Sequence, residues 1–527
     1  MTGKNQIGNQ LKAAGTIKFR TFNPKLNTEN DCIFTEASDG EINQALSLAQ
    51  DAFGEFRAMS GERKGAFLDA IADEILALDD ELIQVYMNES GLPEGRAKGE
   101  RGRTIFQLRA FANLVCEGSW LEARIDTAVP DRTPIPKSDL RKMKIGIGPI
   151  VVFGASNFPL AYSTAGGDTA SALAAGCPVI VKSHPMHAGT SELVARAVIK
   201  AAEKTGMPNG VFSNLNSRGI EVGTELVKHP IVKGVGFTGS IRGGRALFNL
   251  AAKRKEPIPV FAEMGSVNPV ILMPEYLQNN TESIAKTYAG SITLGTGQFC
   301  TNPGLILGVK SDALSSFIEA LGNEITEIDP MCMLHPTIAT NFENGKIKLL
   351  EQKGIKLVNH SIKSSDPNHA QQGIATVDGG AFLLNSNLHE EVFGPFSLVV
   401  QCEDLDQLTH IIEELDGQLT GTILTENSEL AANPALIRAM QDRVGRLIFN
   451  SVPTGVEVCP SMSHGGPYPA STDARFTAVG TDSIQRWVRP VSYQDWPNEL
   501  LPDELKNENP LAISRKVNNA DTRDAIS

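Results

Sequence analysis

Long apolar runs are missing from this 527-residue chain. Nowhere do about 18 apolar residues follow one another, which is roughly what a membrane span needs. The first residues, Met-Thr-Gly-Lys-Asn-Gln, are polar and have no apolar run behind them. We therefore expect no signal peptide, no membrane span and a cytoplasmic location.

Positive charge is scarce as well. The chain has 48 Lys and Arg residues against 61 Asp and Glu residues, which gives a net charge of −13. This balance disfavours nucleic acids and anionic membranes as partners. A small anionic ligand would need a local site.

Paired cysteines and clustered metal ligands are also absent from the sequence. The seven cysteines are odd in number and scattered, and none forms a Cys-x-x-Cys pair. They do not resemble a disulfide framework or a zinc site, and we expect six of them to be small buried hydrophobes. His184 and His187 lie close together but flank Pro185, with no third ligand nearby. We predict no metal site.

Cys300 differs from the other cysteines because of the stretch around it. Residues 294–305 read Leu-Gly-Thr-Gly-Gln-Phe-Cys-Thr-Asn-Pro-Gly-Leu. Glycine and proline end a helix and allow unusual backbone angles, which favours a presented side chain over a core position. We predict that Cys300 is a nucleophile. An ordinary thiol, with a pKa of about 8.5, is only a few per cent thiolate at neutral pH, so it needs a base or a favourable field.

The pattern of strands and helices predicts the fold class. A single hydrophobic core stops growing at roughly 250 to 300 residues, so this chain should form two or more domains. From Lys144, short apolar strands such as 149–153, 179–181 and 232–237 alternate with small-residue helices, and the alternation returns in 305–450. We predict an α/β fold of two doubly wound α/β domains with parallel sheets.

Other stretches stand outside this alternation. Residues 127–139 are Pro-rich and indicate a linker or an extended excursion, and 481–493 could be a strand that pairs outside its own domain. Residues 498–527 are polar, and we expect a surface tail. Apolar positions at helical spacing predict covering helices at 41–59, 63–85 and 99–116.

Two turns place a reactive residue type at a strand end. The strand that ends at Phe237 runs into Thr-Gly-Ser, where Ser240 opens a helix whose free N–H groups favour a phosphate, with Ser240 as cap or direct ligand. The G-x-G-x-x-G fingerprint is missing, so this turn alone is weak evidence for a dinucleotide. Glu263 ends an apolar run before Gly265, which indicates either a helix cap or a base in a partly apolar site.

Six motifs together carry a family resemblance. They are Ser-Asn-Phe-Pro with Asn157, Lys182 after its strand, Phe-Thr-Gly-Ser at 237–240, Glu-Met-Gly with Glu263, Gly-Gln-Phe-Cys-Thr with Cys300, and Glu-Val-Phe-Gly-Pro at 391–395. In their order and spacing the chain resembles the aldehyde dehydrogenase superfamily. The resemblance implies oxidation of an aldehyde to a carboxylic acid with NAD or NADP.

The resemblance also implies roles for these residues. Cys300 would attack the aldehyde, the Asn157 amide and the Cys300 backbone N–H would hold the oxyanion, and Glu263 would activate the water that hydrolyses the acyl-thioester. The presence of Glu263 favours a free acid over transfer to coenzyme A. The cofactor-binding residues implied are Lys182 and Glu391 at the riboses, Ser240 at the pyrophosphate, Phe393 near the nicotinamide, and Gly239, Gly265 and Arg218.

The choice between NAD and NADP leans slightly towards NADP. NAD-preferring relatives often have a glutamate where this chain has Pro185. Such a carboxylate would accept from the ribose 2′-OH and repel a 2′-phosphate. Without it, Lys182 and Arg218 are available as cationic partners for that phosphate.

Within the family, the chain is similar to the branch that oxidises α-ketoglutaric semialdehyde to 2-oxoglutarate. A carboxylate-bearing aldehyde needs a cation, and Arg103 or Arg109 is a candidate clamp, although either could be a plain surface arginine. The resemblance also places Gln107, Phe158 and Ser451 in the substrate site. The same branch resembles fatty-aldehyde dehydrogenases, so a long apolar aldehyde is the alternative substrate.

A domain organisation follows from the same resemblance. The expected parts are a Rossmann-like cofactor-binding domain at 1–129 and 150–268, a catalytic domain at 269–450, a small β oligomerisation element at 130–149 and 481–497, and a substrate-site loop returning to the cofactor domain at 451–480. The β element would join subunits in a homodimer or homotetramer.

Interpretations from other classes stay open. Taken singly, Asn157 fits a turn former and Cys300 a buried thiol. An inactive structural or binding homologue would keep the fold without the activity. A cysteine hydrolase would need a histidine base, and no histidine lies in a turn comparable to that of Cys300.

Overall fold

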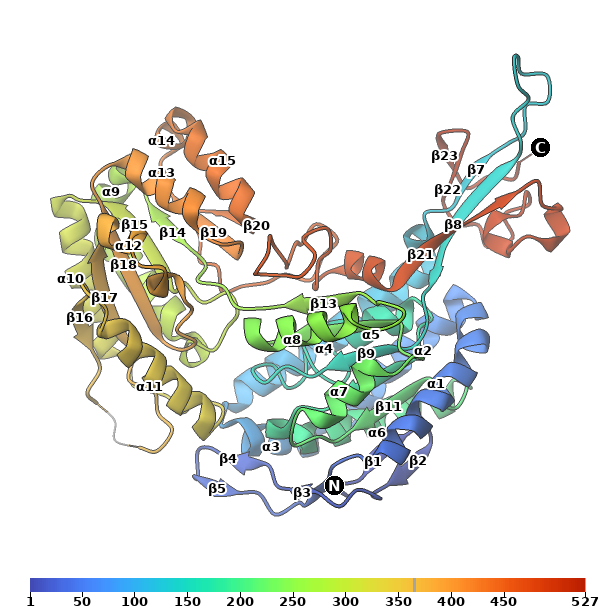
Figure 1. The fold of residues 1–527 in the computed structure, drawn as a ribbon, viewed down its shortest axis with the longest axis horizontal. Coiled ribbons are helices and arrows are strands. Elements are labelled where there is room, and N and C mark those ends of the chain that lie inside the picture. The colour runs from blue at the N-terminus through green and yellow to red at the C-terminus, as the bar shows by residue number, and fades with distance from the viewer. Residues whose placement is uncertain (364–365, 527) are drawn as a thin grey trace.

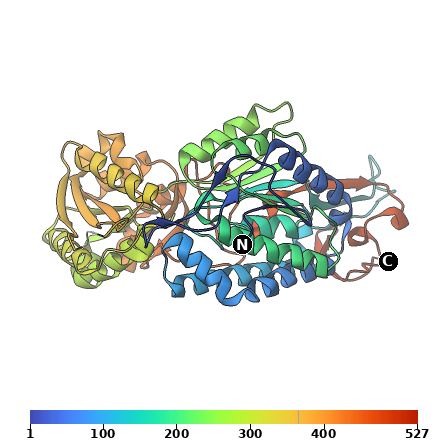
Figure 2. The same ribbon diagram turned by 90° about the horizontal axis from the view of Figure 1, so that it is seen from below.

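Two seven-stranded sheets, each covered by helices, form the two lobes of the molecule (Figure 1). The computed structural model describes residues 1–363 and 366–526. A third sheet, of five strands, projects from the first lobe as an arm. The same two lobes are seen from below in Figure 2. None of the helices in these described residues is both long and apolar enough to cross a membrane.

The sheet of the first lobe runs in the order β13-β12-β9-β10-β11-β1-β2. Its central strands are parallel, and every residue of β9 and β10 is buried, as expected for strands covered on both faces. The short antiparallel strands β1 and β2 extend its edge and were not predicted, because three residues are too few to show a period of two. The bounds are β1 (Asn5–Ile7), β2 (Gln10–Lys12), β9 (Ile150–Phe153), β10 (Val179–Lys182), β11 (Phe212–Leu215), β12 (Gly234–Thr238) and β13 (Val260–Glu263).

Helices cover both faces of this sheet, and two differ from the predictions. The stretch 63–85 is not one helix, because α2 ends at Leu76 and α3 begins at Asp79, where the backbone has φ +41°. The helix predicted at 99–116 begins earlier, directly after Pro93. The bounds are α1 (Asp39–Ala58), α2 (Gly61–Leu76), α3 (Asp79–Ser90), α4 (Glu94–Glu117), α5 (Gly167–Ala174), α6 (Ala188–Lys204), α7 (Glu221–Lys228) and α8 (Ile241–Ala252).

The second lobe contains the sheet β16-β17-β18-β15-β14-β19-β20, which is parallel except for β16. Its strands are β14 (Val270–Leu272), β15 (Leu305–Val309), β16 (Lys356–His360), β17 (Gly373–Asp378), β18 (Phe396–Cys402), β19 (Gln418–Leu424) and β20 (Val444–Phe449). Its helices are α9 (Pro274–Thr293), α10 (Asp312–Glu327), α11 (Pro336–Leu350), α12 (Gly379–Leu383), α13 (Leu405–Glu414), α14 (Asn427–Ala432) and α15 (Pro434–Arg443).

The arm is the sheet β21-β8-β7-β22-β23. Residues 498–526 differ from the polar surface tail that we expect, because they add β22 and β23 to this sheet and bury Leu505, Ile513 and Arg515. Few apolar residues suffice to anchor the segment, so composition alone did not reveal it. The strands of the arm are β7 (Arg124–Asp126), β8 (Leu140–Gly146), β21 (Val488–Gln494), β22 (Arg515–Val517) and β23 (Ala520–Thr522).

Two short antiparallel pairs lie near the N-terminus, outside the three large sheets. They are β3 (Lys18–Phe19) with β6 (Phe34–Thr35), and β4 (Phe22–Asn23) with β5 (Thr28–Glu29).

The carboxyl ends of the first sheet's parallel strands point at the second lobe. β12 and β13 are in register, with Thr238 beside Glu263, so the loops that follow them start at the same edge. Asn157 follows β9 at this edge. In open α/β sheets, ligands bind at this edge.

Candidate active site

The Cys300 loop owes its shape to a left-handed backbone. Short helix η3 (Leu294–Gly297) follows α9, and Gly295, Thr296 and Gly297 have φ of +55°, +60° and +63°. A Cβ on Gly297 would overlap the backbone of Gly394 in the second lobe. Glycine is therefore required there, and the reversal of the chain places Cys300 between the lobes.

Side-chain amides hold this loop from both sides. Asn157 Nδ2 donates to the Gln298 carbonyl at 3.1 Å. Asn268 Nδ2 donates to the carbonyls of Cys300 at 2.9 Å and Asn302 at 2.8 Å. Asn268 is not among the predicted site residues. The one signal in the sequence is that it lies shortly after the Glu-Met-Gly motif. Both asparagines are buried, so the loop is fixed from the interior.

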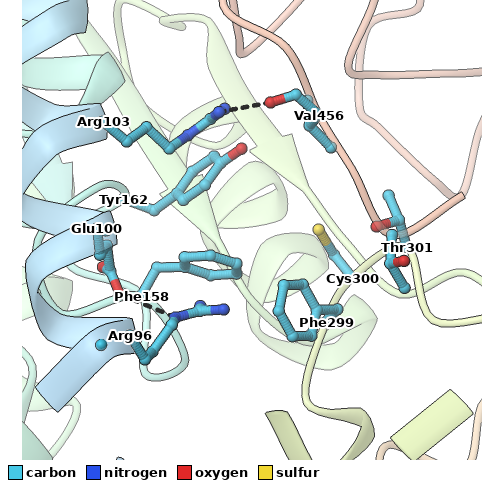
Figure 3. Close-up of a pocket in the computed structure, with 12 residues that line it drawn as sticks. Arg96, Glu100, Arg103, Phe158, Tyr162, Phe299, Cys300, Thr301 and Val456 are labelled. Carbon is cyan, nitrogen blue, oxygen red and sulfur yellow. Dashed lines mark hydrogen bonds and ion pairs between the residues drawn. The ribbon is translucent and has the colours of Figure 1, made fainter. Parts of the chain in front are cut away.

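Cys300 lines two cavities at once. The first, of about 280 Å³, is also lined by Arg96, Glu100, Arg103, Phe158, Tyr162 and Phe299, as Figure 3 shows. The second, of about 320 Å³, is also lined by Asn157, Gly239, Ser240, Glu263, Glu391 and Phe393. A sulfur at this junction can meet one molecule from each side.

Glu263 ends β13 and is only 7% exposed. No helix starts after it, so it is not a helix cap. Its Oε2 has no hydrogen-bond partner among the described residues. Burial raises the pKa of Glu263 well above its usual range, and Arg486 only partly opposes this. The side chain is therefore a proton acceptor of enhanced basicity once it is ionised.

His464 lies beside Cys300, although the sequence shows no histidine in a turn comparable to that of Cys300. Its Nε2 lies 3.5 Å from Cys300 Sγ, although the two residues are 164 positions apart. Burial, followed by Arg446 and Arg103, lowers the pKa of His464 to about 3. Burial and Glu263 raise the pKa of the Cys300 thiol to about 12. Thiol and imidazole are thus a neutral hydrogen-bonded pair at rest, and no local sequence pattern joins them.

The second cavity offers the features that a dinucleotide requires. Ser240 caps α8 by accepting from Gly243 N at 3.2 Å, and the start of this helix is exposed to the cavity. Helix N-termini bind phosphates through their free N–H groups. A Cβ on Gly265 would lie 2.5 Å from Glu391 Oε2, so glycine keeps this wall open. The residues present fit a nicotinamide dinucleotide.

Comparisons with known proteins identify the family of this chain. The sequence model described as "Aldehyde dehydrogenase family" matches residues 11–478. The chain is 48% identical over 516 residues to alpha-ketoglutaric semialdehyde dehydrogenase 2 of Azospirillum brasilense, with 98% of each chain covered. It is 45% identical over 517 residues to alpha-ketoglutaric semialdehyde dehydrogenase of Acinetobacter baylyi, again with 98% coverage of both. The chain belongs to the aldehyde dehydrogenase family.

Solved structures confirm the predicted fold of this aldehyde dehydrogenase. Methylmalonate-semialdehyde dehydrogenase from Oceanimonas doudoroffii superposes with a TM-score of 0.80 at 19% identity, covering 94% of this chain and 99% of the other. A Thermus 1-pyrroline-5-carboxylate dehydrogenase with bound NAD gives 0.78 at 20% identity, with 93% and 92% covered. The family also confirms the predicted enzyme class, an NAD(P)-dependent oxidoreductase that acts on aldehydes.

Two predicted cofactor residues lie outside the lining of the second cavity. Burial lowers the pKa of Lys182 to about 8, and nearby Glu36 opposes this. Glu36 Oε2 accepts the backbone N–H of Arg218 at 2.5 Å and of Gly219 at 3.2 Å. Lys182 and Arg218 are thus near a shared carboxylate, while Ser240, Gly239, Gly265, Glu391 and Phe393 line the cavity itself.

Of the five predicted substrate residues, only Arg103 and Phe158 line the first cavity. Arg109 forms an ion pair with Asp73 at 3.0 Å, and its side chain is half exposed. It lies six positions after Arg103 on α4, so the two side chains point to different sides of the helix. Gln107 is buried, and the Ser451 carbonyl accepts from the Tyr288 hydroxyl. The geometry therefore favours Arg103 over Arg109.

Arg96 is the cavity residue that the sequence analysis missed. Its guanidinium lies 4.4 Å from the ring centroid of Phe158 and 4.6 Å from that of Phe299. The predicted helix start at residue 99 left Arg96 outside the helix. The signal was nevertheless present, since residues 96, 100 and 103 share one helical face.

Proposed function

We propose that this protein oxidises α-ketoglutaric semialdehyde to 2-oxoglutarate through a thioester on Cys300, with NAD or NADP as the hydride acceptor. The position of Cys300 at the junction of two cavities carries the proposal. The names and full-length similarity of the two relatives support the substrate.

The first step adds the thiol across the aldehyde carbonyl. Sulfur bonds to the carbonyl carbon, the thiol proton passes to Glu263 and from there to solvent, and the carbonyl oxygen becomes an oxyanion. Asn157 donates one amide N–H to Gln298, so its second N–H can serve the oxyanion together with the Cys300 backbone N–H. Loss of one such donor typically raises the barrier by about 2.7 to 4 kcal/mol. Bound NAD(P) supplies the chemistry of the oxidation by accepting a hydride from the same carbon.

The second step releases the acid. Glu263 takes a proton from water, the resulting hydroxide adds to the thioester carbonyl, and the carbon–sulfur bond breaks. The sulfur leaves as a thiolate that is reprotonated. A buried carboxylate without a hydrogen-bond partner suits this role, because its affinity for a proton is raised.

We infer a slight preference for NADP. Pro185 begins short helix η2 and brings no carboxylate to the loop after Lys182. Lys182 would then meet a 2′-phosphate without a competing acid on that loop. The ratio of kcat/KM for NADP and NAD tests this, and a ratio in favour of NAD would overturn it.

We also propose that the arm joins subunits into a homodimer or homotetramer. The arm exposes Ile135 to 68% and Trp496 to 50%, which is apolar surface that a second copy could cover. The predicted domain boundaries remain part of this proposal. Light scattering should give a mass above that of one chain, and a monomer would contradict the role of the arm.

A substrate panel tests the proposed reaction. α-Ketoglutaric semialdehyde, succinic semialdehyde and a long-chain aldehyde are compared by the appearance of reduced nicotinamide. Two arginines in a cavity of about 280 Å³ favour the short anionic aldehydes. A higher kcat/KM for the long-chain aldehyde would support the alternative substrate, and no turnover of any aldehyde would indicate an inactive homologue.

A further inference from the structure

We propose that Arg96, and not Arg103 or Arg109, binds the carboxylate of the substrate. This inference rests on the proposed function and names the residue that selects an anionic aldehyde. Arg96 and Arg103 both line the first cavity with Cys300. They differ in how their hydrogen-bond donors are already used.

Arg96 keeps part of its guanidinium available. Its Nε lies 3.5 Å from Glu100 Oε2, in an ion pair along one side of α4. Its side chain also hydrogen-bonds the Tyr86 hydroxyl, which itself donates to Glu100, and further N–H donors of the guanidinium remain for a ligand. The planar fork of an arginine matches the two oxygens of a carboxylate.

The position of Arg96 is fixed by the two loops that carry the reaction. Its guanidinium packs against Phe158, which follows Asn157, and against Phe299, which precedes Cys300. The two rings are themselves in edge contact, with centroids 5.4 Å apart. Figure 3 shows Arg96 beside Phe158 and Phe299. A carboxylate bound there would hold the far end of a short aldehyde next to both loops.

Glu100 orients Arg96 without neutralising it fully. Its Oε1 accepts the N–H groups of Leu160 and Ala161 at 2.8 and 2.9 Å, and its Oε2 accepts the Tyr86 hydroxyl at 2.6 Å. The negative charge of Glu100 is therefore shared among several donors. With Arg96 and Arg103 against one Glu100, the charged lining of the cavity is net positive. An anionic substrate would balance this positive charge.

Arg103 performs a different task. Its guanidinium donates to the Val456 carbonyl and hydrogen-bonds the Tyr162 hydroxyl. Burial raises the pKa of Tyr162, and the nearby Arg103 partly opposes this rise. These contacts join α4 to the segment that closes the cavity opposite it (Figure 3). Loss of Arg103 should therefore disturb every substrate alike.

The test uses substrates that differ in charge alone. 5-Oxopentanoate carries a carboxylate, and 5-oxopentanamide is its neutral counterpart of the same shape. We compare kcat/KM for both in the full-length wild-type enzyme and in Arg96→Gln, Arg96→Lys, Arg103→Gln and the surface control Arg109→Gln. Cofactor binding and thermal melting verify that each variant folds.

Arg96→Gln should lower kcat/KM for the acid roughly 10- to 100-fold and for the amide less than about threefold, as expected for the loss of hydrogen bonds to a charged group. Arg96→Lys should restore only part of the loss, because the fork is missing. Equal effects of Arg96→Gln on acid and amide, or a charge-selective loss in Arg103→Gln instead, would overturn the inference. Failure of the wild type to oxidise α-ketoglutaric semialdehyde would reject the proposed substrate, while the acid–amide comparison would still judge Arg96.

Discussion

Replacing Glu263 by glutamine should separate the two halves of the reaction. Glutamine keeps the shape of the side chain and cannot accept a proton from water. General-base catalysis contributes roughly 10²- to 10⁴-fold, or about 2.7 to 5.5 kcal/mol of barrier. Hydride transfer precedes the hydrolysis for which Glu263 activates water, so the variant should form about one equivalent of reduced nicotinamide per active site and then slow by that factor.

Stopped-flow absorbance of the reduced nicotinamide measures both phases. Because burial raises the pKa of Glu263, the basic form of the wild type is lost as pH falls through this raised value, and steady-state turnover should fall with it. The pH-dependent limb should be absent in Glu263→Gln. The same raised pKa makes the wild type less stable as pH rises above 4.5, the ordinary value for the unfolded chain, and glutamine should remove that slope. Unchanged steady-state turnover without a burst would refute the assigned role.

Further variants test the rest of the site. Asn157→Ala should lower kcat about 10²- to 10³-fold while cofactor binding is retained, and a loss confined to cofactor binding would contradict its place at the oxyanion. Asn268→Ala should lower both kcat and the melting temperature, since the Cys300 carbonyl loses its side-chain donor at a cost of about 1 to 3 kcal/mol, while the Asn302 carbonyl keeps the Gly304 N–H. Because the pKa of His464 is lowered to about 3, the rate of Cys300 alkylation by iodoacetamide should show no step near pH 6.5. A step at that pH that disappears in His464→Asn would instead indicate a charged imidazole.

Local chemistry made much of the site predictable. Glycines allow the left-handed backbone of the Cys300 loop, Glu263 stands at the end of a strand, and Ser240 caps the start of a helix. Each of these local features can be recognised in the sequence. Strands such as β9 and β10 are buried on both faces, so their continuous apolar runs are strong signals. The alternation of these runs with helices is sufficient to indicate the fold class.

The residues that escaped prediction depend on distant contacts. His464 meets Cys300 only because the segment after β20 returns between the lobes, and no local pattern encodes that return. Arg96 was missed because glycines at 95, 99 and 102 weaken the helical signal at the start of α4. Arg109 was a candidate because sequence alone does not fix which face of α4 meets the cavity, and its pairing with Asp73 decides the matter.

The central claim is that Cys300 carries the acyl group between the two cavities. Glu263→Gln enzyme, quenched in acid after mixing with α-ketoglutaric semialdehyde and NADP, gives peptides for mass spectrometry. We expect one acyl adduct per chain, located on the peptide that contains Cys300, and no adduct in a variant that also carries Cys300→Ala. An adduct on another residue, or full turnover by Cys300→Ala alone, would contradict the account.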